Sequence, residues 1–532
     1  MNVYILLAAV IIMACVFCNK ISNKFGIPAL LVFILLGMFF GTDGVIRISF
    51  DNYKFAEEIC SAALIFIMFY GGFGTKWSAA KPVAPQAALL SSAGVVMTAG
   101  LTGVFCHFVL KISLMESFLI GSLISSTDAA SVFSILRSKR LNLKYNTASL
   151  LEIESGSNDP LSYMLTTIML GLMGGDDFSI GHILYSVFAQ IVYGSIIGVA
   201  AAFVTVFILK HFKFVTDGFD TIFVFGIVLL SYALPSAIGG NGYLSAYIFG
   251  IILGNMKLNN KKSLVHFFDG LTGLMQMLVF FLLGLLSTPS VLPKVAVPGL
   301  FIALFLTFVA RPVVVFVLLT PFGCKMKQQL LISFAGLRGA ASVVFATIAI
   351  TSPAYTGPDI FHMVFFIVLF SILLQGTLLP FVAKKLDMID EEEDVLKTFT
   401  DYTDEVPVQF IQFTVKEGHP WADSQVKDIL LPPETLLVQV QHGKDTITPD
   451  GNTTLKAGDV LILSAKAPGV VKNVSLTELT LDKGNEWIGN TVSGIDLDAG
   501  KLVVMIQRNG DIVIPNGSTV LNESDVLVIK EG

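Results

Sequence analysis

Five ionisable residues lie inside segments that are otherwise apolar enough to cross a membrane. They are the acids Asp128, Glu154 and Asp159 and the bases Arg311 and Arg338. A charge at membrane depth costs at least ~2.5–3.5 kcal/mol on insertion scales, so it usually faces a partner or a water-filled site. An ion pair that only holds helices together could explain any one of these residues. Three acids and two bases, however, leave one carboxylate without a mate, and we expect that carboxylate to bind an ion.

Small polar residues and glycines surround these charges. The segments are 125–128 (Ser-Ser-Thr-Asp), 154–160 (Glu-Ser-Gly-Ser-Asn-Asp-Pro) and 336–339 (Gly-Leu-Arg-Gly). Pro160 has no backbone N–H and therefore frees a carbonyl near Gly156, which predicts a break in that helix. Interrupted helices at corresponding places in two halves of a transporter form ion sites near the membrane midplane. Freed carbonyls and small hydroxyls are also the oxygen ligands that alkali cations need.

Asp159 is the candidate for a shared site that holds either a proton or a cation. Burial disfavours the charged form of a carboxylate, so a proton can compete with the cation for it. The neighbouring residue, Asn158, is an amide and not a second acid. One titrating carboxylate per site implies one proton per cation and an electroneutral exchange, whereas two adjacent acids would permit two protons.

Thirteen apolar segments could carry these residues across a membrane. The chain has 532 residues and is 54% hydrophobic and 14% charged, against ~25% charged in soluble domains. A span needs about 20 mainly apolar residues. The candidate spans are 3–19, 26–41, 55–73, 84–110, 114–136, 147–173, 180–209, 219–237, 241–256, 264–288, 292–320, 328–351 and 359–385. Because no basic residue precedes 3–19, we interpret it as a retained span and not a cleaved signal.

Basic residues are divided unevenly among the loops between these spans. If alternate loops, starting after the first span, face the cytoplasm, they hold 17 Lys and Arg residues and the opposite loops hold four. Cytoplasmic loops of membrane proteins carry such an excess. We therefore expect a multi-pass protein of the bacterial inner (plasma) membrane, with its N-terminus outside and its C-terminal domains in the cytoplasm.

Three motifs together resemble the NhaP-type branch of the monovalent cation:proton antiporters. Residues 126–130 (Ser-Thr-Asp-Ala-Ala), 154–160 and 336–340 (Gly-Leu-Arg-Gly-Ala) have that family's order and spacing, and the resemblance covers residues 1 to about 388. It implies an all-α polytopic fold of about thirteen helices with inverted repeats and discontinuous helices. It also implies a homodimer in membrane lipid and a core of spans 5, 6, 12 and 13 that moves in an elevator-like way.

The same resemblance implies a role for each residue of the ion site. Asp159 would carry the cation or the proton, and Ser155 and the backbone of Thr127 would help to ligate the ion. Asn158 and Thr127 would brace the crossing of the unwound helices.

Further residues would support or flank the site. Asp128 would be polar support at the crossing, and Glu154 would pair with Arg338, a buried pair whose disruption costs ~3–5 kcal/mol. Arg311 is interpreted as structural. Many members of the family carry an acid just before two paired glycines of span 3, and here that place is held by Tyr70. We therefore do not transfer to Tyr70 the ligand or gate role that this acid has in other members of the family.

The composition changes after about residue 388. From Asp390 onward the chain has 24 acidic and 11 basic residues, a net charge of −13, whereas the preceding part has a net charge of +7. Residues 389–405 are typical of an acidic linker. A repeat at an offset of 66 residues then aligns 421–464 with 487–530, with fifteen identities in 44 positions and short β-rich runs in both copies. We expect two copies of one small α+β module, at 406–472 and 473–532.

The segment 455–461 (Leu-Lys-Ala-Gly-Asp-Val-Leu) resembles the TrkA C-terminal (RCK-C) domain of potassium transport regulators. The resemblance implies regulation, often by a nucleotide, although no Gly-rich dinucleotide fingerprint precedes the modules. A stabilising or dimerising cap is the alternative. If a ligand exists, cyclic di-AMP or another adenine nucleotide is our choice. These modules also favour K⁺ over Na⁺ as the exchanged cation.

Two other classes of function fit the sequence less well. A tail-gated cation channel would need a filter loop such as Thr-Val-Gly-Tyr-Gly, which is absent. An enzyme would need the metalloprotease spacing HExxH or a histidine close to Ser155 or Ser157, and the seven histidines are scattered. We therefore expect no catalytic activity, no cofactor in the membrane part and no nucleic-acid partner. A Na⁺(Li⁺)/H⁺ antiporter remains the alternative to K⁺/H⁺ exchange.

Overall fold

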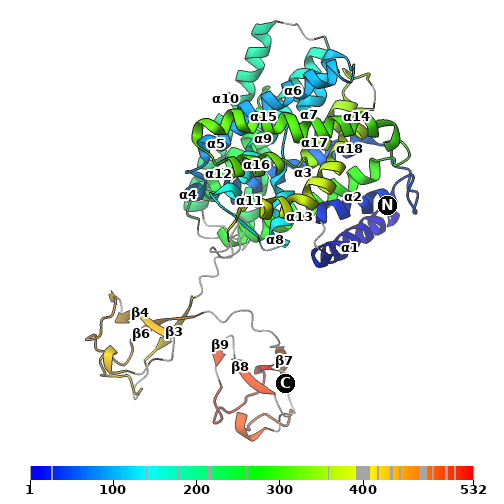
Figure 1. Ribbon diagram of the computed structural model, residues 1–532. Coiled ribbons are helices and arrows are strands. Elements are labelled where there is room, and N and C mark those ends of the chain that lie inside the picture. The colour runs from blue at the N-terminus through cyan, green and yellow to red at the C-terminus, as the bar shows by residue number, and fades with distance from the viewer. Residues whose placement is uncertain are drawn as a thin grey trace. The chain divides into compact units, whose positions relative to one another are not determined.

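The computed structural model divides into two compact units, Met1–Tyr402 and Thr403–Gly532, which are described separately (Figure 1). The residues described in the first unit are 2–25, 28–138, 141–175, 179–212, 218–258, 261–357 and 359–390. Those described in the second unit are 408–415, 419–429, 431, 435–442, 445–466, 476–481, 485–495, 497, 501–508, 511–513 and 515–530.

The first unit is built almost entirely from helices (Figure 1). In its first half these are α1 (Asn2–Phe25), α2 (Ala29–Phe40), α3 (Tyr53–Gly74), α4 (Trp77–Ala80), α5 (Ala84–Leu89), α6 (Val95–Phe108), α7 (Leu114–Leu123), α8 (Ala129–Ser138), α9 (Thr147–Met173) and α10 (Ile180–His211). In its second half they are α11 (Phe219–Ala237), α12 (Gly242–Asn255), α13 (Lys261–Leu286), α14 (Leu292–Phe305), α15 (Arg311–Leu319), α16 (Met326–Phe334), α17 (Ala340–Thr351), α18 (Ile360–Phe370) and α19 (Thr377–Lys385).

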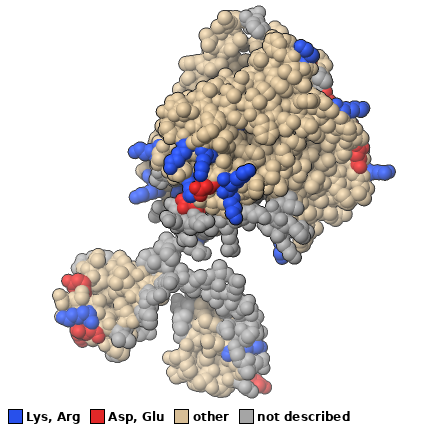
Figure 2. Space-filling model, in the orientation of Figure 1, with Lys and Arg blue, Asp and Glu red and all other residues tan. Residues whose placement is uncertain are grey.

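Each of the thirteen expected spans falls on one or more of these helices, which confirms the helical membrane fold. Seven helical stretches of the described residues are long and apolar enough to cross a membrane by themselves. The longest helix, α10, has large exposed apolar side chains such as Ile180, Phe203 and Phe207, as a lipid-facing helix requires. On the face shown in Figure 2, a broad area of this unit lacks charged side chains, and Lys and Arg gather mainly at one end.

Local sequence explains where several helices begin. Side chains of Asn52, Ser113, Asn241 and Asp359 accept hydrogen bonds from the first turns of α3, α7, α12 and α18. Such N-caps satisfy backbone donors that the helix itself leaves free. The caps thereby fix where these four helices begin.

Two helices are interrupted where the polar motifs predict it. Backbone without helical structure separates α7 from α8 at the Ser-Ser-Thr-Asp segment, and α16 from α17 at the Gly-Leu-Arg-Gly segment. Ser, Thr and Asp side chains compete for backbone hydrogen bonds, and glycine weakens a helix, so both segments disfavour helix. The two breaks meet, because the backbone N–H of Asp128 donates to the carbonyl of Leu337 at 2.8 Å.

The third predicted interruption is wrong. Helix α9 runs without a break from Thr147 to Met173, with Pro160 inside it. Neighbouring groups hold the turns around the proline: Asn241 donates its side-chain amide to the carbonyl of Pro160 at 2.7 Å, and the Ser157 hydroxyl donates to the carbonyl of Ile153. Proline is tolerated inside membrane helices when contacts from neighbouring groups stabilise the surrounding turns.

Three long helical stretches contain one wider, π-type turn. These turns are η1 (Leu90–Gly94), η2 (Leu306–Ala310) and η4 (Ser371–Gly376). Such turns rotate the following side chains around the helix axis and occur often at functional sites. Here η2 ends directly before Arg311, and η4 begins at Ser371, whose hydroxyl accepts a hydrogen bond from the backbone of Arg338.

Glycines allow the helices around the site to pack closely. A Cβ added to Gly37 of α2 would lie 2.2 Å from the carbonyl oxygen of Phe281 in α13. A Cβ added to Gly250 of α12 would lie 2.1 Å from the carbonyl oxygen of Phe69 in α3. Small residues of this kind let membrane helices approach backbone to backbone. Helices α2, α3, α12 and α13 therefore form a tightly packed group.

The second unit contains two four-stranded antiparallel sheets with the same topology. One has the order β3-β6-β4-β5 and the other β7-β10-β8-β9. Their strands are β3 (Val408–Thr414), β4 (Thr435–His442), β5 (Asp445–Ile447), β6 (Val460–Lys466), β7 (Leu476–Thr480), β8 (Leu502–Arg508), β9 (Asp511–Val513) and β10 (Val526–Lys530). The short 3-10 turns η5 (Val426–Asp428) and η6 (Val492–Gly494) also correspond.

The cores of the two modules repeat as well. Val415, Leu437 and Leu461 are buried in the first module, and their equivalents at an offset of 66 are buried in the second. This agreement confirms that the tail is a tandem repeat of one fold.

Candidate functional site

A small cavity of about 50 Å³ opens where the two helix breaks meet α9. One wall comes from the breaks, the start of α17 and α9, and a second wall comes from α2, α3 and α13. The lining residues are Ser126, Thr127, Asp128, Asp159, Gly339, Ala340 and Ala341 on the first wall and Leu30, Leu64, Ile67, Gln276 and Phe280 on the second. The cavity is thus polar on one side and mainly apolar on the other.

Asp159 is the acid of α9 that faces this cavity. Its side chain is buried and accepts a hydrogen bond from the hydroxyl of Ser126. No Lys or Arg in the described part of the chain forms an ion pair with it. A buried carboxylate without a countercharge is costly in its ionised form. Binding a cation compensates the charge, and binding a proton removes it.

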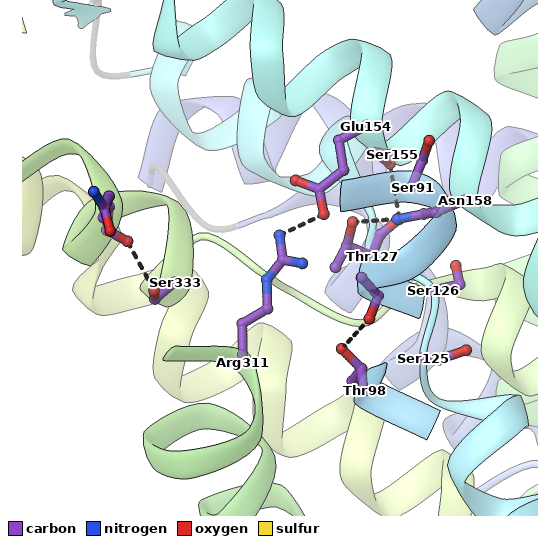
Figure 3. A network of polar contacts seen from close by, with 12 residues as sticks. Ser91, Thr98, Ser125, Ser126, Thr127, Glu154, Ser155, Asn158, Arg311 and Ser333 are labelled. Carbon is purple, nitrogen blue, oxygen red and sulfur yellow. Dashed lines mark hydrogen bonds and ion pairs between the residues drawn. The ribbon is translucent and has the colours of Figure 1, made fainter. Parts of the chain in front are cut away.

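Further oxygen atoms converge beside Asp159. The hydroxyl of Ser155 donates to the backbone carbonyl of Thr127 at 2.7 Å, and the amide of Asn158 donates to the hydroxyl of Thr127 at 2.6 Å (Figure 3). The side-chain oxygen of Asn158 is buried and has no hydrogen-bond partner among the described residues. The structure therefore brings together all four residues that the sequence predicts for the ion site.

Asp128 has a different local environment. Its carboxylate accepts hydrogen bonds from the backbone N–H and the hydroxyl of Ser131, at 3.3 and 2.6 Å. It also lies against Gly339, where an added Cβ would be 2.3 Å from a carboxylate oxygen. Asp128 thus joins the first turn of α8 to the second break, and the support role expected for it stays a prediction.

The expected ion pair between Glu154 and Arg338 is not present. Glu154 instead pairs with Arg311 at 2.5 Å, and both side chains are buried (Figure 3). The guanidinium of Arg338 donates to the backbone carbonyls of Ser125 and Ser126 at 2.7 and 2.6 Å. The break after α7 leaves these carbonyls without helical donors, and an arginine can satisfy two of them at once. Arg311 thus has the structural role expected for it, with a partner that the sequence did not indicate.

Several residues of the site were not identified from the sequence. Ser126 is the hydroxyl that binds Asp159, but three adjacent hydroxyl residues cannot be ranked without the backbone path. Gln276 could have been identified from the sequence, because it is a polar residue in the apolar run of α13. Tyr247 of α12 packs on Gly156, and its hydroxyl lies 3.1 Å from the hydroxyl of Ser157. Nothing local in the sequence marks that contact.

Comparisons with known proteins agree with this arrangement. The family model described as sodium/hydrogen exchanger, transmembrane, matches residues 7–385, and the TrkA-C domain model matches residues 410–472 and 476–530. The chain is 33% identical over 477 residues to the K(+)/H(+) antiporter NhaP of Alkalimonas amylolytica, which covers 88% of this chain and 82% of that protein. It is 30% identical to the K(+)/H(+) antiporter NhaP2 of Shewanella sp. (strain MR-4), with 86% of this chain and 80% of that protein covered.

More distant similarity extends to an archaeal protein of known structure. The Na(+)/H(+) antiporter 1 of Methanocaldococcus jannaschii is 30% identical over 344 residues, which cover 62% of this chain and 79% of that protein. The solved structure of the sodium proton antiporter MjNhaP1 from the same organism, at pH 8, superposes with a TM-score of 0.63 at 26% identity. That match covers 71% of this chain and 100% of the other.

Proposed function

Because the chain belongs to the sodium/hydrogen exchanger family, whose members are membrane cation/proton antiporters and not enzymes, we propose that Asp159 is its shared carrier site. Asp159 binds either one proton or one monovalent cation. The observation that carries the proposal is the buried Asp159 carboxylate, which faces the cavity without a basic partner among the described residues.

The neighbouring oxygens supply the rest of the cation site. The Ser155 hydroxyl and the Thr127 carbonyl lie 2.7 Å apart and become cation ligands when the hydroxyl turns away from the carbonyl. Asn158 holds Thr127 in place through its amide. Because Asn158 is neutral, the site gains one proton for each cation that it releases, and the exchange carries no net charge.

K⁺ is the proposed substrate cation. Two relatives that match 86–88% of this chain are named K(+)/H(+) antiporters, and the match extends into the TrkA-C part of the tail. Exchange of Na⁺ or Li⁺ for H⁺ is the alternative, supported by the archaeal relative named as a Na(+)/H(+) antiporter, which matches 62% of this chain.

We propose an architecture from the family resemblance and from the distribution of basic residues among the loops. The protein is a homodimer of a bacterial plasma membrane, with the N-terminus outside and the tail in the cytoplasm. The exchanger domain comprises residues 1–388, the linker 389–405, and the two TrkA-C domains 406–472 and 473–532. The tail binds a regulatory nucleotide, cyclic di-AMP or another adenine nucleotide. Calorimetric titration of the full-length protein with these nucleotides tests whether the tail binds them. An exchange rate that does not change at a saturating nucleotide concentration would contradict a regulatory role of the nucleotide.

Exchange measured in vesicles tests the carrier site. Proton release from acid-loaded vesicles, followed by dequenching of a pH-sensitive dye, is expected with K⁺, and Na⁺, Li⁺ and Rb⁺ define the selectivity. Asp159→Asn is expected to abolish exchange with every cation, and undiminished exchange in this variant would contradict the proposal. A turnover that changes with membrane potential would contradict electroneutral exchange. Asn158→Asp, which adds a second acid, is expected to introduce such a dependence.

A further inference from the structure

A second polar pair lies on two of the helices that line the apolar wall of the cavity. Tyr70 of α3 donates its hydroxyl to a carboxylate oxygen of Asp269 in α13 at 3.1 Å. The same two helices contribute Ile67 and Gln276 to the cavity that contains Asp159. Tyr70 is three residues from Ile67, and Asp269 is seven residues from Gln276, so each lies on the cavity-facing side of its helix.

The pair lies between the cavity and one end of the membrane unit. Tyr70 lies between the cavity and the C-terminal end of α3, and Asp269 lies between the cavity and the N-terminal end of α13. These ends adjoin loops that contain Lys76, Lys81 and Lys257. Such basic loops are the ones expected on the cytoplasmic side. The pair is thus on the cytoplasmic side of the ion site.

Polar groups continue along α13 from this pair to the cavity. Thr272 lies three residues after Asp269 and four residues before Gln276, which places all three on one stripe of the helix. The hydroxyl of Thr272 is buried and has no hydrogen-bond partner among the described residues. An unsatisfied buried hydroxyl is energetically unfavourable. This cost is offset if the hydroxyl contacts water or a cation that passes along the stripe.

The charge of Asp269 is available to a cation. Its side chain is exposed, and no Lys or Arg of the described ranges forms an ion pair with it. The buried Tyr70 holds one carboxylate oxygen by its hydroxyl and so orients the carboxylate. An exposed carboxylate next to a low-dielectric wall attracts cations from solution.

We propose that Asp269 and Tyr70 form an outer cation-binding subsite, from which a partly hydrated monovalent cation passes along Thr272 and Gln276 to Asp159. The proposal rests on the proposed role of Asp159 as the carrier. The Asp269 carboxylate, oriented by the Tyr70 hydroxyl, replaces part of the hydration shell, and water supplies the remaining ligands. Asp269 binds the cation, and Tyr70 is a positioning residue.

Initial exchange rates of the full-length protein in proteoliposomes test the subsite, with K⁺ varied separately on each side. Asp269→Asn is expected to raise KM for K⁺ roughly three- to tenfold on one side only, with kcat unchanged. Tyr70→Phe is expected to raise KM in the same direction by a smaller factor, and Asp269→Glu to restore most of the affinity. Glu58→Gln removes an exposed acid from the opposite end of α3 and is the matched control, with no change expected.

Several outcomes would overturn the proposal. An unchanged KM in Asp269→Asn, or a lower kcat at unchanged KM, would assign Asp269 a structural role. An equal rise in Glu58→Gln, or a rise in Asp269→Asn that disappears when choline chloride raises the ionic strength, would assign it to the general surface potential. The elution profile and thermal unfolding in detergent identify variants that fail to fold. If Asp269→Asn does not fold, the KM for K⁺ is measured in Asp269→Glu instead.

Asp159→Asn in the same preparations separates this proposal from the proposed function. Exchange in Asp159→Asn would overturn the carrier site itself. An inactive Asp159→Asn together with an unchanged KM in Asp269→Asn would overturn the outer subsite alone.

Discussion

At the scale of single residues, the buried pair of Glu154 and Arg311 is the clearest departure from expectation. Both side chains are almost fully buried, and they are 2.5 Å apart. Removing one partner leaves an uncompensated charge, so Arg311→Gln is expected to lower the free energy of unfolding by ~3–5 kcal/mol. Unfolding in mixed detergent micelles measures the change.

A double-mutant cycle distinguishes this pair from the one inferred from the sequence. Glu154→Gln and Arg311→Gln are expected to be strongly non-additive, because each removes the partner of the other. Glu154→Gln and Arg338→Gln are expected to be closer to additive, because Arg338 donates to backbone carbonyls. A larger coupling of Glu154 with Arg338 than with Arg311 would contradict the geometry.

The contact of Gly339 with Asp128 provides a second test at this scale. An added Cβ at Gly339 would lie 2.3 Å from the Asp128 carboxylate, so Gly339→Ala must displace that side chain or the helix break. We expect the exchange rate to fall markedly and stability to fall by ~1–3 kcal/mol. Gly100→Ala in α6 is the control, because nothing lies within 4 Å of its added Cβ. A Gly339→Ala variant with unchanged exchange would show that Asp128 need not be held there.

At the scale of elements, the two tail modules share a fold but differ in one polar contact. In the second module Arg508 donates two hydrogen bonds of 2.8 Å to the buried Asp525, and in the first module the equivalent pair is His442 and Asp459 at 2.5 Å. The guanidinium of Arg508 holds the pKa of Asp525 below its usual range. Arginine stays charged at every relevant pH, so the contact in the second module always carries a countercharge for Asp525.

This difference predicts an acid sensitivity for the second module. Because the folded pKa of Asp525 is lowered, its contribution to stability is present above the unfolded pKa of ~3.9 and is lost as pH falls through the folded value. Arg508→Gln removes the cause of the shift, so the second module is expected to become less stable at neutral pH and to unfold at a higher pH. Hydrogen exchange of β8 and β10 in the full chain measures this. Strands β4 and β6 are the internal control, and equal changes there would contradict a local effect.

At the scale of the whole molecule, a short strand pair connects the end of the membrane unit to the ion-site helices. Strand β2 (Ile389–Asp390) pairs with β1 (Asn142–Leu143), which lies between α8 and α9. Lys144 and Asp387 form an ion pair of 3.0 Å beside it. A force on the chain after residue 390 would therefore act on the loop between the two helices that position Asp128 and Asp159.

Truncation tests whether the two units are independent. Each has its own buried apolar clusters, so deletion of 403–532 is expected to leave a folded membrane unit that still exchanges cations for protons. Its dependence on pH or on a tail ligand is expected to change. Deletion of 387–532, which also removes β2 and Asp387, is expected to destabilise the α8–α9 loop. Complete loss of exchange by a well-folded 1–402 protein would contradict a purely regulatory tail.

The sequence by itself determined the helical class, the two interrupted helices and the tandem repeat of the tail, and it predicted four candidate site residues that lie close together in the structure. These features depend on apolar length, on local competition for backbone hydrogen bonds at residues 125–128 and 336–339, and on a repeat with a fixed offset. Each of these is a property of a short stretch of chain.

Only the tertiary structure decided which groups satisfy one another. The pairing of Glu154 with Arg311, the continuity of α9 through Pro160 and the contact between Tyr70 and Asp269 each join elements that are far apart in the chain. A buried charge or a missing backbone donor requires a partner, but its local sequence does not say which helix supplies it. Helix packing makes that choice, because it brings one of several chemically equivalent partners within hydrogen-bond distance.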